Sequence, residues 1–147
     1  MDCVFCRIRD GQIPSTRVYE DERTIAFMDI NPLNDGHTLV IPRVHAATLF
    51  EADEADLQAA IATARRVARA IRETIRPDGL NLLQANGAAA FQSVPHFHFH
   101  LVPIHRGREG LRLADGRRRP DAHPGGRRQD PEGAPVSGRG SSGEAAP

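Results

Sequence analysis

Three histidines alternate with large apolar residues near the middle of the chain, where residues 96–102 have the sequence His-Phe-His-Phe-His-Leu-Val. Alternation with a period of two is typical of a β-strand, in which successive side chains point to opposite faces. The pattern therefore predicts that His96, His98 and His100 share one face and that the residues between them share the other. Imidazole has an ordinary pKa near 6.5, so such a face can handle a proton, a metal ion or a phosphate.

A neutral imidazole is a suitable nucleophile for phosphorus, because it approaches an anionic phosphate without charge repulsion. Its product, a phosphoramidate, breaks down once a proton reaches it, so two displacements replace one difficult hydrolysis. The imidazole attacks through one nitrogen only if the other carries the proton. A neighbouring carbonyl or side chain must therefore fix the tautomer.

The elements that would position these histidines form an α+β pattern. Short apolar runs between turn residues predict strands, and the run that ends at Pro42 follows Asn-Asp-Gly turn residues. Asp53 is a good N-cap for a helix that ends at 77–79. Within that helix the apolar positions step by three and four residues, which predicts an amphipathic helix with the stripe Leu57, Ile61, Ala64, Ala68, Ile71 and Ile75. The predicted strands are 16–20, 24–28, 37–41, 80–84 and 96–102.

The composition changes near residue 105. Residues 106–147 hold nine of the thirteen Gly, five of the eleven Pro and nine of the nineteen basic residues, with three large aliphatic side chains. Such a segment cannot bury a core, so we expect a folded domain at 1–105 and a disordered Arg/Gly/Pro-rich tail at 106–147. The alternative is a polyanion-binding arm built on Arg117, Arg118, Arg119, Arg127 and Arg128.

The bulk properties exclude several classes of protein. The formal net charge is zero, so we do not expect nucleic acid as a partner. We expect neither a signal peptide nor a membrane span, because the sequence has no long apolar run. The predicted location is therefore cytosolic, where Cys3 and Cys6 are expected to be thiols or metal ligands and not a structural disulfide.

The histidine strand resembles the signature of the histidine triad (HIT) family of nucleotide hydrolases and transferases. Other blocks are similar to the family in order and spacing, so the resemblance covers about residues 3–104. They are Phe-Met-Asp-Ile-Asn-Pro at 27–32, Gly-His-Thr-Leu-Val-Ile-Pro-Arg-Val-His at 36–45, and the segment from Asn86-Gly87 to Gln92-Ser93-Val94. The resemblance implies the HIT-like fold, a five-stranded antiparallel sheet with one long and one short helix.

The resemblance also implies a role for each matching residue. His98 would attack the α-phosphorus of a purine nucleotide and carry a nucleotidyl intermediate. The other implied roles are flanking histidines (His37 and His100), phosphate contacts (Gln92, Ser93 and Asn86), a ribose contact (Asp29) and apolar base contacts (Phe5 and Ile30). For Asp29 the alternative is a turn acid, and for Phe5 it is simple core packing.

The pair Cys3-x-x-Cys6 is a weak metal signal alone, but two more ligands would strengthen it. His45 and His96 could complete a tetrahedral site of two cysteines and two histidines. Zinc-bearing members of the HIT family use these positions, so the resemblance implies a structural zinc ion, with unligated thiols as the alternative. On this interpretation His96 supports the strand and leaves His98 free to attack.

The expected activity is hydrolysis or nucleotidyl transfer on an AMP-containing substrate, either a nucleoside phosphoramidate or a diadenosine polyphosphate. HIT proteins are usually homodimers, which is the expected oligomeric state. One alternative is a metal-dependent hydrolase whose histidine strand supplies the ligands, although such sites usually add a carboxylate. The other is a non-catalytic nucleotide-binding or protein-interaction module.

Overall fold

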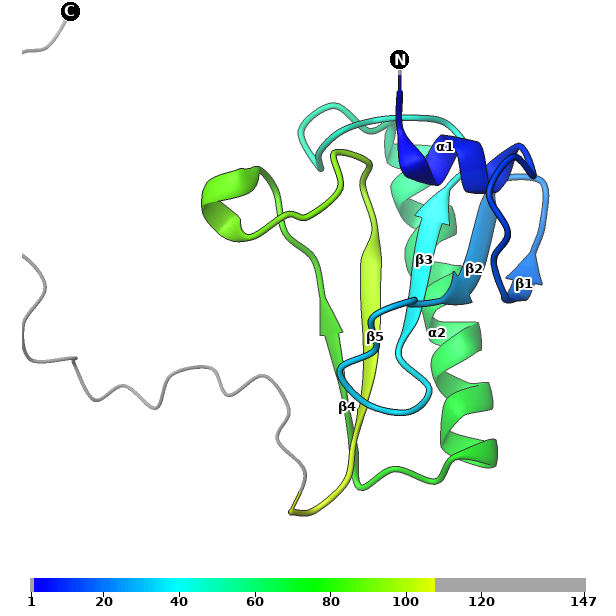
Figure 1. Ribbon diagram of the computed structural model, residues 1–147, viewed down its shortest axis with the longest axis vertical. Helices are drawn as coiled ribbons and strands as arrows, with labels where there is room; N and C mark the ends of the chain where they lie inside the picture. The colour runs from blue at the N-terminus through cyan, green and yellow to red at the C-terminus, as the bar shows by residue number, and fades with distance from the viewer. Residues whose placement is uncertain (1, 108–147) are drawn as a thin grey trace, which may run out of the picture. The chain divides into compact units, whose positions relative to one another are not determined.

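The computed structural model describes residues 2–107, which form a five-stranded antiparallel sheet with one long and one short helix (Figure 1). This architecture confirms the predicted fold class. Apart from its first two positions, the predicted tail lies outside the described residues, and the domain boundary at 105 stays a prediction. No helix within residues 2–107 is long and apolar enough to cross a membrane. The cytosolic location also stays a prediction.

The sheet has the spatial order β1-β2-β3-β5-β4, and every neighbouring pair is antiparallel. β5 lies between β3 and β4, which places the histidine strand between two partners, with His100 opposite Leu39 of β3. The strands lie within two residues of their predicted starts except the last one. They are β1 (Arg17–Glu20), β2 (Thr24–Met28), β3 (Thr38–Pro42), β4 (Gly79–Leu83) and β5 (Phe99–Ile104).

The long helix α2 (Glu54–Thr74) covers one face of the sheet (Figure 1). Its buried stripe packs against residues of β2, β3 and β5 and consists of Ala60, Ala64, Val67 and Ile71. The predicted stripe was wrong at Ile61, which is 44% exposed. The helix turns so that Ala60 and not Ile61 faces the sheet, because a small side chain lets the helix approach the strands closely.

The short helix α1 (Val4–Arg9) covers the opposite face of the sheet. Phe5 and Ile8 are buried there against side chains that point away from α2. These side chains alternate along β2 and β3, as the period of two requires. They are Ile25, Phe27, Leu39 and Ile41. The chain therefore has a second apolar layer, and the functional residues lie on this side.

The last strand begins three residues later than predicted. Residues 96–98 precede β5, which starts at Phe99, so only His100 of the three histidines lies within the strand. Two main-chain hydrogen bonds outside the sheet explain the difference: His96 N–H bonds to the Val94 carbonyl (2.8 Å), and Phe97 N–H bonds to the distant Ala46 carbonyl (2.7 Å). The apolar alternation persists, with Phe97 and Leu101 buried.

Candidate active site and metal-binding cluster

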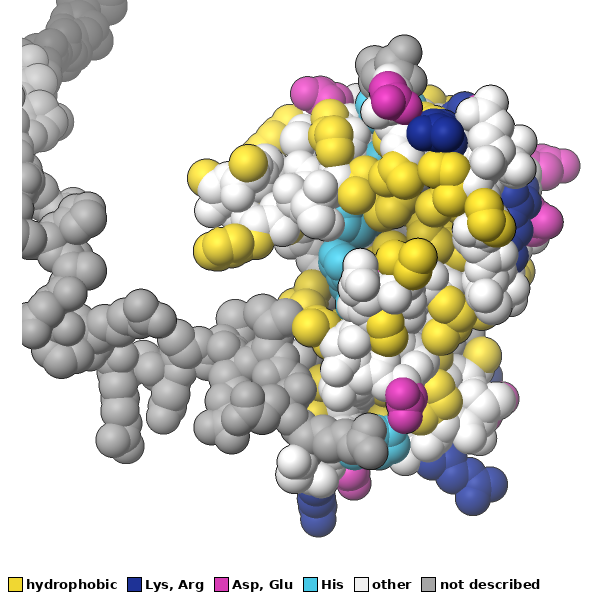
Figure 2. Space-filling model, in the orientation of Figure 1, with side chains coloured by type: hydrophobic (Ala, Val, Ile, Leu, Met, Phe, Trp, Pro, Cys, Tyr) yellow, Lys and Arg dark blue, Asp and Glu magenta, His cyan; other side chains and the backbone are white. Residues whose placement is uncertain are grey.

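A cleft of about 630 Å³ opens on the α1 side of the sheet. Figure 2 shows apolar side chains gathered on this face, with histidine at their edge. The cleft brings together most of the residues predicted to act on a nucleotide: Phe5, Asp29, Ile30, Ser93, His98 and His100. Residues 13–16 form a further part of its lining, which sequence reasoning missed. The polar Pro-Ser-Thr run before β1 was the available signal.

His98 is held as one defined tautomer. Its side chain is 2% exposed, and its Nδ1 lies 2.6 Å from the main-chain carbonyl oxygen of His96. A carbonyl can only accept a hydrogen bond, so Nδ1 carries the proton and Nε2 carries the lone pair. The ring also packs edge-on against Phe5 with centroids 5.1 Å apart. Nε2 of His98 therefore carries the lone pair that a nucleophilic attack would use.

A one-way chain of hydrogen bonds leads to His98 from the loop between β2 and β3. The main-chain N–H of Leu33 donates to Nδ1 of His37 (3.1 Å), which forces the proton of neutral His37 onto Nε2. That Nε2–H donates to Nδ1 of His100 (2.9 Å). His100 therefore carries its own proton on Nε2, which lies 3.1 Å from Nε2 of His98. One main-chain donor thus sets the tautomers of the two histidines predicted to flank the nucleophile.

Burial keeps these imidazoles uncharged. Desolvation lowers the pKa of His37 and of His98 below the ordinary value. The pKa of His100 falls to about 4, first because of burial and then because His98 and His37 lie nearby. The neutral forms that the hydrogen-bond chain requires are therefore the stable forms near neutral pH.

Asp29 lies at the end of β2 beside the histidine chain. Its Oδ2 is 3.5 Å from Nε2 of His37 and 4.0 Å from Nδ1 of His100. Its Oδ1 accepts the main-chain N–H of Asn31 (2.8 Å), which is the bond expected of a turn acid. The turn interaction occupies one carboxylate oxygen, and the carboxylate still lines the cleft. Ribose binding by Asp29 stays a prediction.

The two predicted base contacts differ in exposure. Ile30 is 91% exposed and lines the outer part of the cleft. Phe5 is buried and touches the rings of Phe27 and His98 edge-on. Phe5 therefore packs in the core and also forms part of the cleft wall, so both interpretations of this residue fit its position.

Gln92 and Asn86 bond within loops and do not line the cleft. The Gln92 side chain accepts the N–H of Gly87 (2.7 Å) and donates to the carbonyl of Ala47 (2.6 Å). Asn86 Oδ1 accepts the N–H of Leu49 (2.7 Å). These bonds join the loop before β5 to the loop after β3. Direct phosphate contacts by Gln92 and Asn86 stay predictions.

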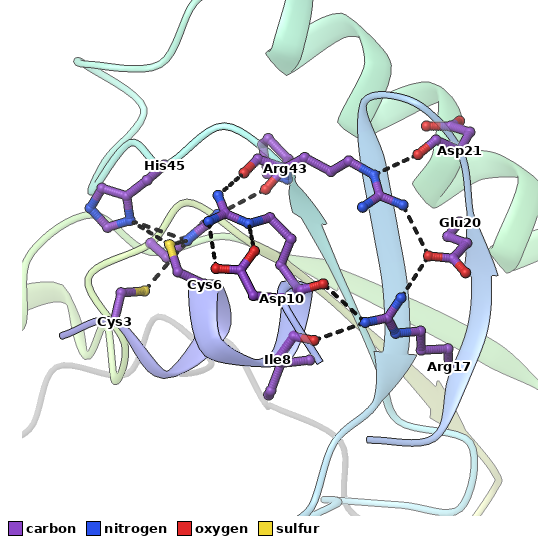
Figure 3. Close-up of polar contacts among 12 residues, drawn as sticks. Cys3, Cys6, Ile8, Asp10, Arg17, Glu20, Asp21, Arg43 and His45 are labelled. Atoms are coloured by element: carbon purple, nitrogen blue, oxygen red, sulfur yellow. Dashed lines mark hydrogen bonds and ion pairs between the residues drawn. The ribbon is translucent and has the colours of Figure 1, made fainter. Parts of the chain in front are cut away.

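The four predicted metal ligands meet at the N-terminal end of α1. Figure 3 shows Cys3, Cys6 and His45 turned toward one another. Nδ1 of His96 lies 3.5 Å from Sγ of Cys3, 3.7 Å from Sγ of Cys6 and 3.3 Å from Nδ1 of His45. Sγ of Cys6 lies 3.5 Å from Nδ1 of His45. Residues 93 positions apart in the sequence thus form one compact donor set.

This donor set fits a zinc ion. With bonds of about 2.3 Å to sulfur and about 2.0–2.1 Å to nitrogen, tetrahedral geometry separates sulfur from nitrogen by about 3.6 Å and the two nitrogens by about 3.3 Å. The observed separations match these values. Nε2 of His96 also donates to the Pro42 carbonyl (2.9 Å), which leaves the lone pair of Nδ1 facing the cluster. The cluster could therefore bind a metal ion.

An arginine network fastens α1 to the hairpin of β1 and β2 (Figure 3). Arg17 donates to the carbonyls of Ile8 (2.9 Å) and Arg9 (3.1 Å), at the C-terminal end of the helix. Both Arg17 and Arg43 also bond to the carboxylate of Glu20, at 2.7 Å and 2.9 Å. The helix that supplies both thiols is therefore held at its two ends, by the donor cluster and by this network.

A second group of potential ligands is formed by Asp29, His37 and His100. Its hydrogen bonds argue against a metal ion there. Both ring nitrogens of His37 are already used, since Nδ1 accepts the Leu33 N–H and Nε2 carries the proton shared with His100. A metal ligand needs a free lone pair, so the arrangement disfavours a metal ion on this group. The alternative of a metal ion held by His96, His98 and His100 concerns a different set of ligands and stays a prediction.

Comparisons with known proteins agree with this geometry. Residues 10–107 match the HIT domain family. The chain is 45% identical over 102 residues to the protein hit of Bacillus subtilis, covering 69% of this chain and 70% of that protein. It is 40% identical over 109 residues to the adenosine 5′-monophosphoramidase of Saccharomyces cerevisiae, covering 74% and 66%. A zinc-bound histidine triad protein of Mycobacterium smegmatis has a similar solved structure, with 42% identity, coverage of 82% and 85%, and a TM-score of 0.70.

Proposed function

This chain belongs to the HIT domain family, and from that premise we propose that it transfers or hydrolyses the nucleotidyl group of an AMP-containing substrate. The observation that carries the proposal is the state of His98. The His96 carbonyl holds the His98 proton on Nδ1, so the lone pair is on Nε2. His98 is also one of the residues that line the cleft. A similar protein bears the name adenosine 5′-monophosphoramidase, which supports the same chemistry.

In the first step, the lone pair of His98 Nε2 forms a bond to the α-phosphorus while the bond to the leaving group breaks. A phosphoramidate that is protonated on nitrogen releases a neutral amine, so the site need not supply a proton. His98 becomes cationic, and its Nδ1–H then donates more strongly to the His96 carbonyl. His100 Nε2–H, beside the attacking atom, would donate to a phosphate oxygen.

In the second step, water attacks the phosphorus of the nucleotidyl-histidine. The electron pair of the bond between phosphorus and nitrogen returns to His98, AMP is released, and the proton of the water passes to solvent. Ser93 lines the same cleft as His98 and His100 and would contact a phosphate oxygen. If an alcohol or amine attacked the same intermediate in place of water, the protein would act as a nucleotidyl transferase.

The charge of the cleft favours an amine leaving group over a polyphosphate. None of the described residues that line the cleft is Arg or Lys. A diadenosine polyphosphate would leave as an anion with several charges, which needs nearby cations, whereas a neutral amine needs none. We therefore infer that a nucleoside phosphoramidate is the preferred substrate and that a diadenosine polyphosphate is the second candidate.

The proposal includes a structural zinc ion held by Cys3, Cys6, His45 and His96. The donor separations support it, and so does the zinc-bound relative. When bound, zinc would supply a fixed crosslink between α1, the loop after β3 and the segment before β5. The His98 nucleophile follows His96 by two residues, so the crosslink would support its position.

A direct experiment tests the nucleophile. The purified protein is incubated with adenosine phosphoramidate, quenched without acid and analysed by intact mass for an AMP adduct. We expect the adduct and release of AMP in the wild type, and at least about a thousandfold slower release with no adduct for His98→Ala. His105→Ala is the matched control, because it removes a histidine outside the cleft. An adduct that persists in His98→Ala would refute the assignment.

A further inference from the structure

One side-chain hydrogen bond fastens the loop between β2 and β3 to the end of β5, and a second bond closes the loop on itself. The Asn34 side chain donates from Nδ2 to the carbonyl of Pro103 (3.0 Å), and the Asn34 carbonyl accepts the N–H of His37 (3.1 Å). Gly36 has a φ of +84° and lies so close to its neighbours that a Cβ there would overlap the Cδ1 of Ile75. In Figure 1 this loop crosses β5. The loop is therefore fixed in position relative to β5.

The fastened loop carries the donor that orients the imidazole chain, because Leu33 N–H bonds to Nδ1 of His37. Without that donor, His37 could carry its proton on Nδ1 and accept at Nε2, although the Asp29 carboxylate, 3.5 Å from Nε2, would still oppose this form. His100 would then donate from Nδ1, and its Nε2 lone pair would face the lone pair of His98 Nε2 across 3.1 Å. His98 would relieve this repulsion by moving its proton from Nδ1 to Nε2, which removes both the nucleophilic lone pair on Nε2 and the bond to the His96 carbonyl.

We propose that Asn34 is a positioning residue for the reaction: by fastening the loop to Pro103, it keeps Leu33 N–H on His37 and selects the orientation of the imidazole chain in which His98 can attack. The effect on rate rests on the proposed function, whereas the effect on the tautomers does not. Asn34 does not line the cleft, so it acts through His37 and His100 and not through the substrate.

The side-chain amide is the part of Asn34 that matters. Aspartate has the same shape but cannot donate to a carbonyl, so Asn34→Asp removes the fastening bond. An enzyme histidine held in the wrong tautomer loses several orders of magnitude in rate. A partial loss of the correct orientation should therefore lower kcat by about 10- to 100-fold, while KM changes by less than about twofold.

The test combines kinetics with spectroscopy on the full-length protein. Long-range proton–nitrogen spectra of the imidazoles, recorded without nucleotide near pH 7.5, report which ring nitrogen carries the proton. We expect His37 and His100 to be protonated on Nε2 in the wild type. In Asn34→Asp we expect a substantial population protonated on Nδ1, together with the lower kcat on adenosine phosphoramidate.

A matched control removes an amide that plays no part in the loop. Gln58 bonds to Glu54 on the exposed side of α2, so Gln58→Ala should keep the wild-type tautomers and kcat. If Asn34→Asp does not fold, Asn34→Ser, whose hydroxyl is too short to reach Pro103, takes its place. Unchanged tautomers in the folded variant would overturn the inference, whether or not kcat falls. A wild type that releases no AMP would instead refute the proposed function, and the spectra would still decide the role of Asn34.

Discussion

His98 and His100 differ in what holds their second nitrogen. A main-chain carbonyl holds Nδ1 of His98, whereas the proton of another imidazole holds Nδ1 of His100. The carbonyl leaves His98 with a lone pair on Nε2, and the imidazole leaves His100 with a proton there. Two chemically identical side chains thus become an acceptor and a donor that face each other.

The acid stability of the protein should depend on His100. Its pKa falls to about 4 in the folded state through burial and the neighbouring His98 and His37, with Asp29 opposing the shift, while the unfolded value is about 6.5. Between these values the unfolded chain binds a proton that the folded chain does not, so the free energy of unfolding falls as the pH falls through this window. Between pH 7 and pH 4, the free energy of unfolding of His100→Asn should fall by about 2–3 kcal/mol less than that of the wild type.

Urea denaturation at several pH values measures this difference. Gln58→Ala, which removes a side chain that does not titrate, should follow the wild-type pH dependence. Equal slopes for wild type and His100→Asn would contradict the prediction.

At the scale of single residues, the sequence identified the side chains of the candidate site but not the main-chain groups that hydrogen-bond to them. The alternation of His and Phe and the Cys-x-x-Cys pair both point to residues that the structure brings together. The groups that fix the tautomers are the Leu33 N–H and the carbonyls of His96 and Pro42. Every residue carries the same main-chain groups, so no sequence pattern could single these out.

At the scale of elements, α1 depends on contacts beyond its own sequence. The helix has six residues, and its N-cap Cys3 makes no side-chain capping bond. Helices this short are not stable alone in water, so burial of Phe5 and Ile8, the donor cluster and the arginine network must hold it in place.

Removal of one donor should therefore weaken both metal binding and the fold. We expect wild-type protein purified without a histidine tag to contain about one zinc ion per chain. His45→Ala should contain close to none, and its melting temperature should fall by at least about 10 °C, because the metal stabilises only the folded state. Elemental analysis and calorimetry provide the two measurements. His105→Ala is the control, and full zinc occupancy in His45→Ala would refute the site.

A comparison of two glycines separates the energy of close packing in the β2–β3 loop from the energy of backbone strain. Gly36 and Gly87 have nearly the same φ, +84° and +86°, but only Gly36 would place a Cβ against other atoms. Gly87 has a ψ of 158°, in a region that only glycine normally adopts, so we expect Gly87→Ala to lower the free energy of unfolding by about 1–3 kcal/mol through strain alone. Gly36→Ala should cost about 1–2 kcal/mol more, because Ile75 must move. Chemical denaturation measures the free energy of unfolding of both variants. Equal losses of this free energy would show that the close approach of Gly36 to Ile75 does not contribute to stability.

The elements were predictable where local patterns dominate. Turn residues and alternation located β1, β2 and β3, and the N-cap Asp53 located the start of α2. The late start of β5 was not predictable, because it depends on the bond from Phe97 to Ala46, 51 positions away. The predicted buried face of α2 was wrong at Ile61 for a similar reason. Two apolar stripes lie side by side on the helix, and packing against the sheet decides which of them is buried.

At the scale of the whole molecule, we propose that two copies of the chain associate. β4 ends the sheet and pairs only with β5 among the described strands, and Leu82 on it is 43% exposed. Ile61 is exposed to a similar extent on α2. Apolar side chains exposed on an edge strand and on a helix are typical of an interface.

Sedimentation equilibrium should give a mass of about twice the 16.1 kDa of one chain. Ile61→Glu should weaken association by at least about a hundredfold, because a charge would be buried in the contact. Leu49→Glu is a matched control, since Leu49 is 43% exposed on a loop. A wild type that sediments as a monomer, or an Ile61→Glu variant that remains a dimer, would refute this arrangement.

His96 contributes two chemically separate groups to the molecule, its ring to the donor cluster and its peptide carbonyl to His98. A substitution removes the ring but never the carbonyl. The side chains of the donor cluster can therefore change without removing the carbonyl that holds the His98 proton. One residue thus serves the cluster through a group that a substitution can change and serves His98 through a group that it cannot.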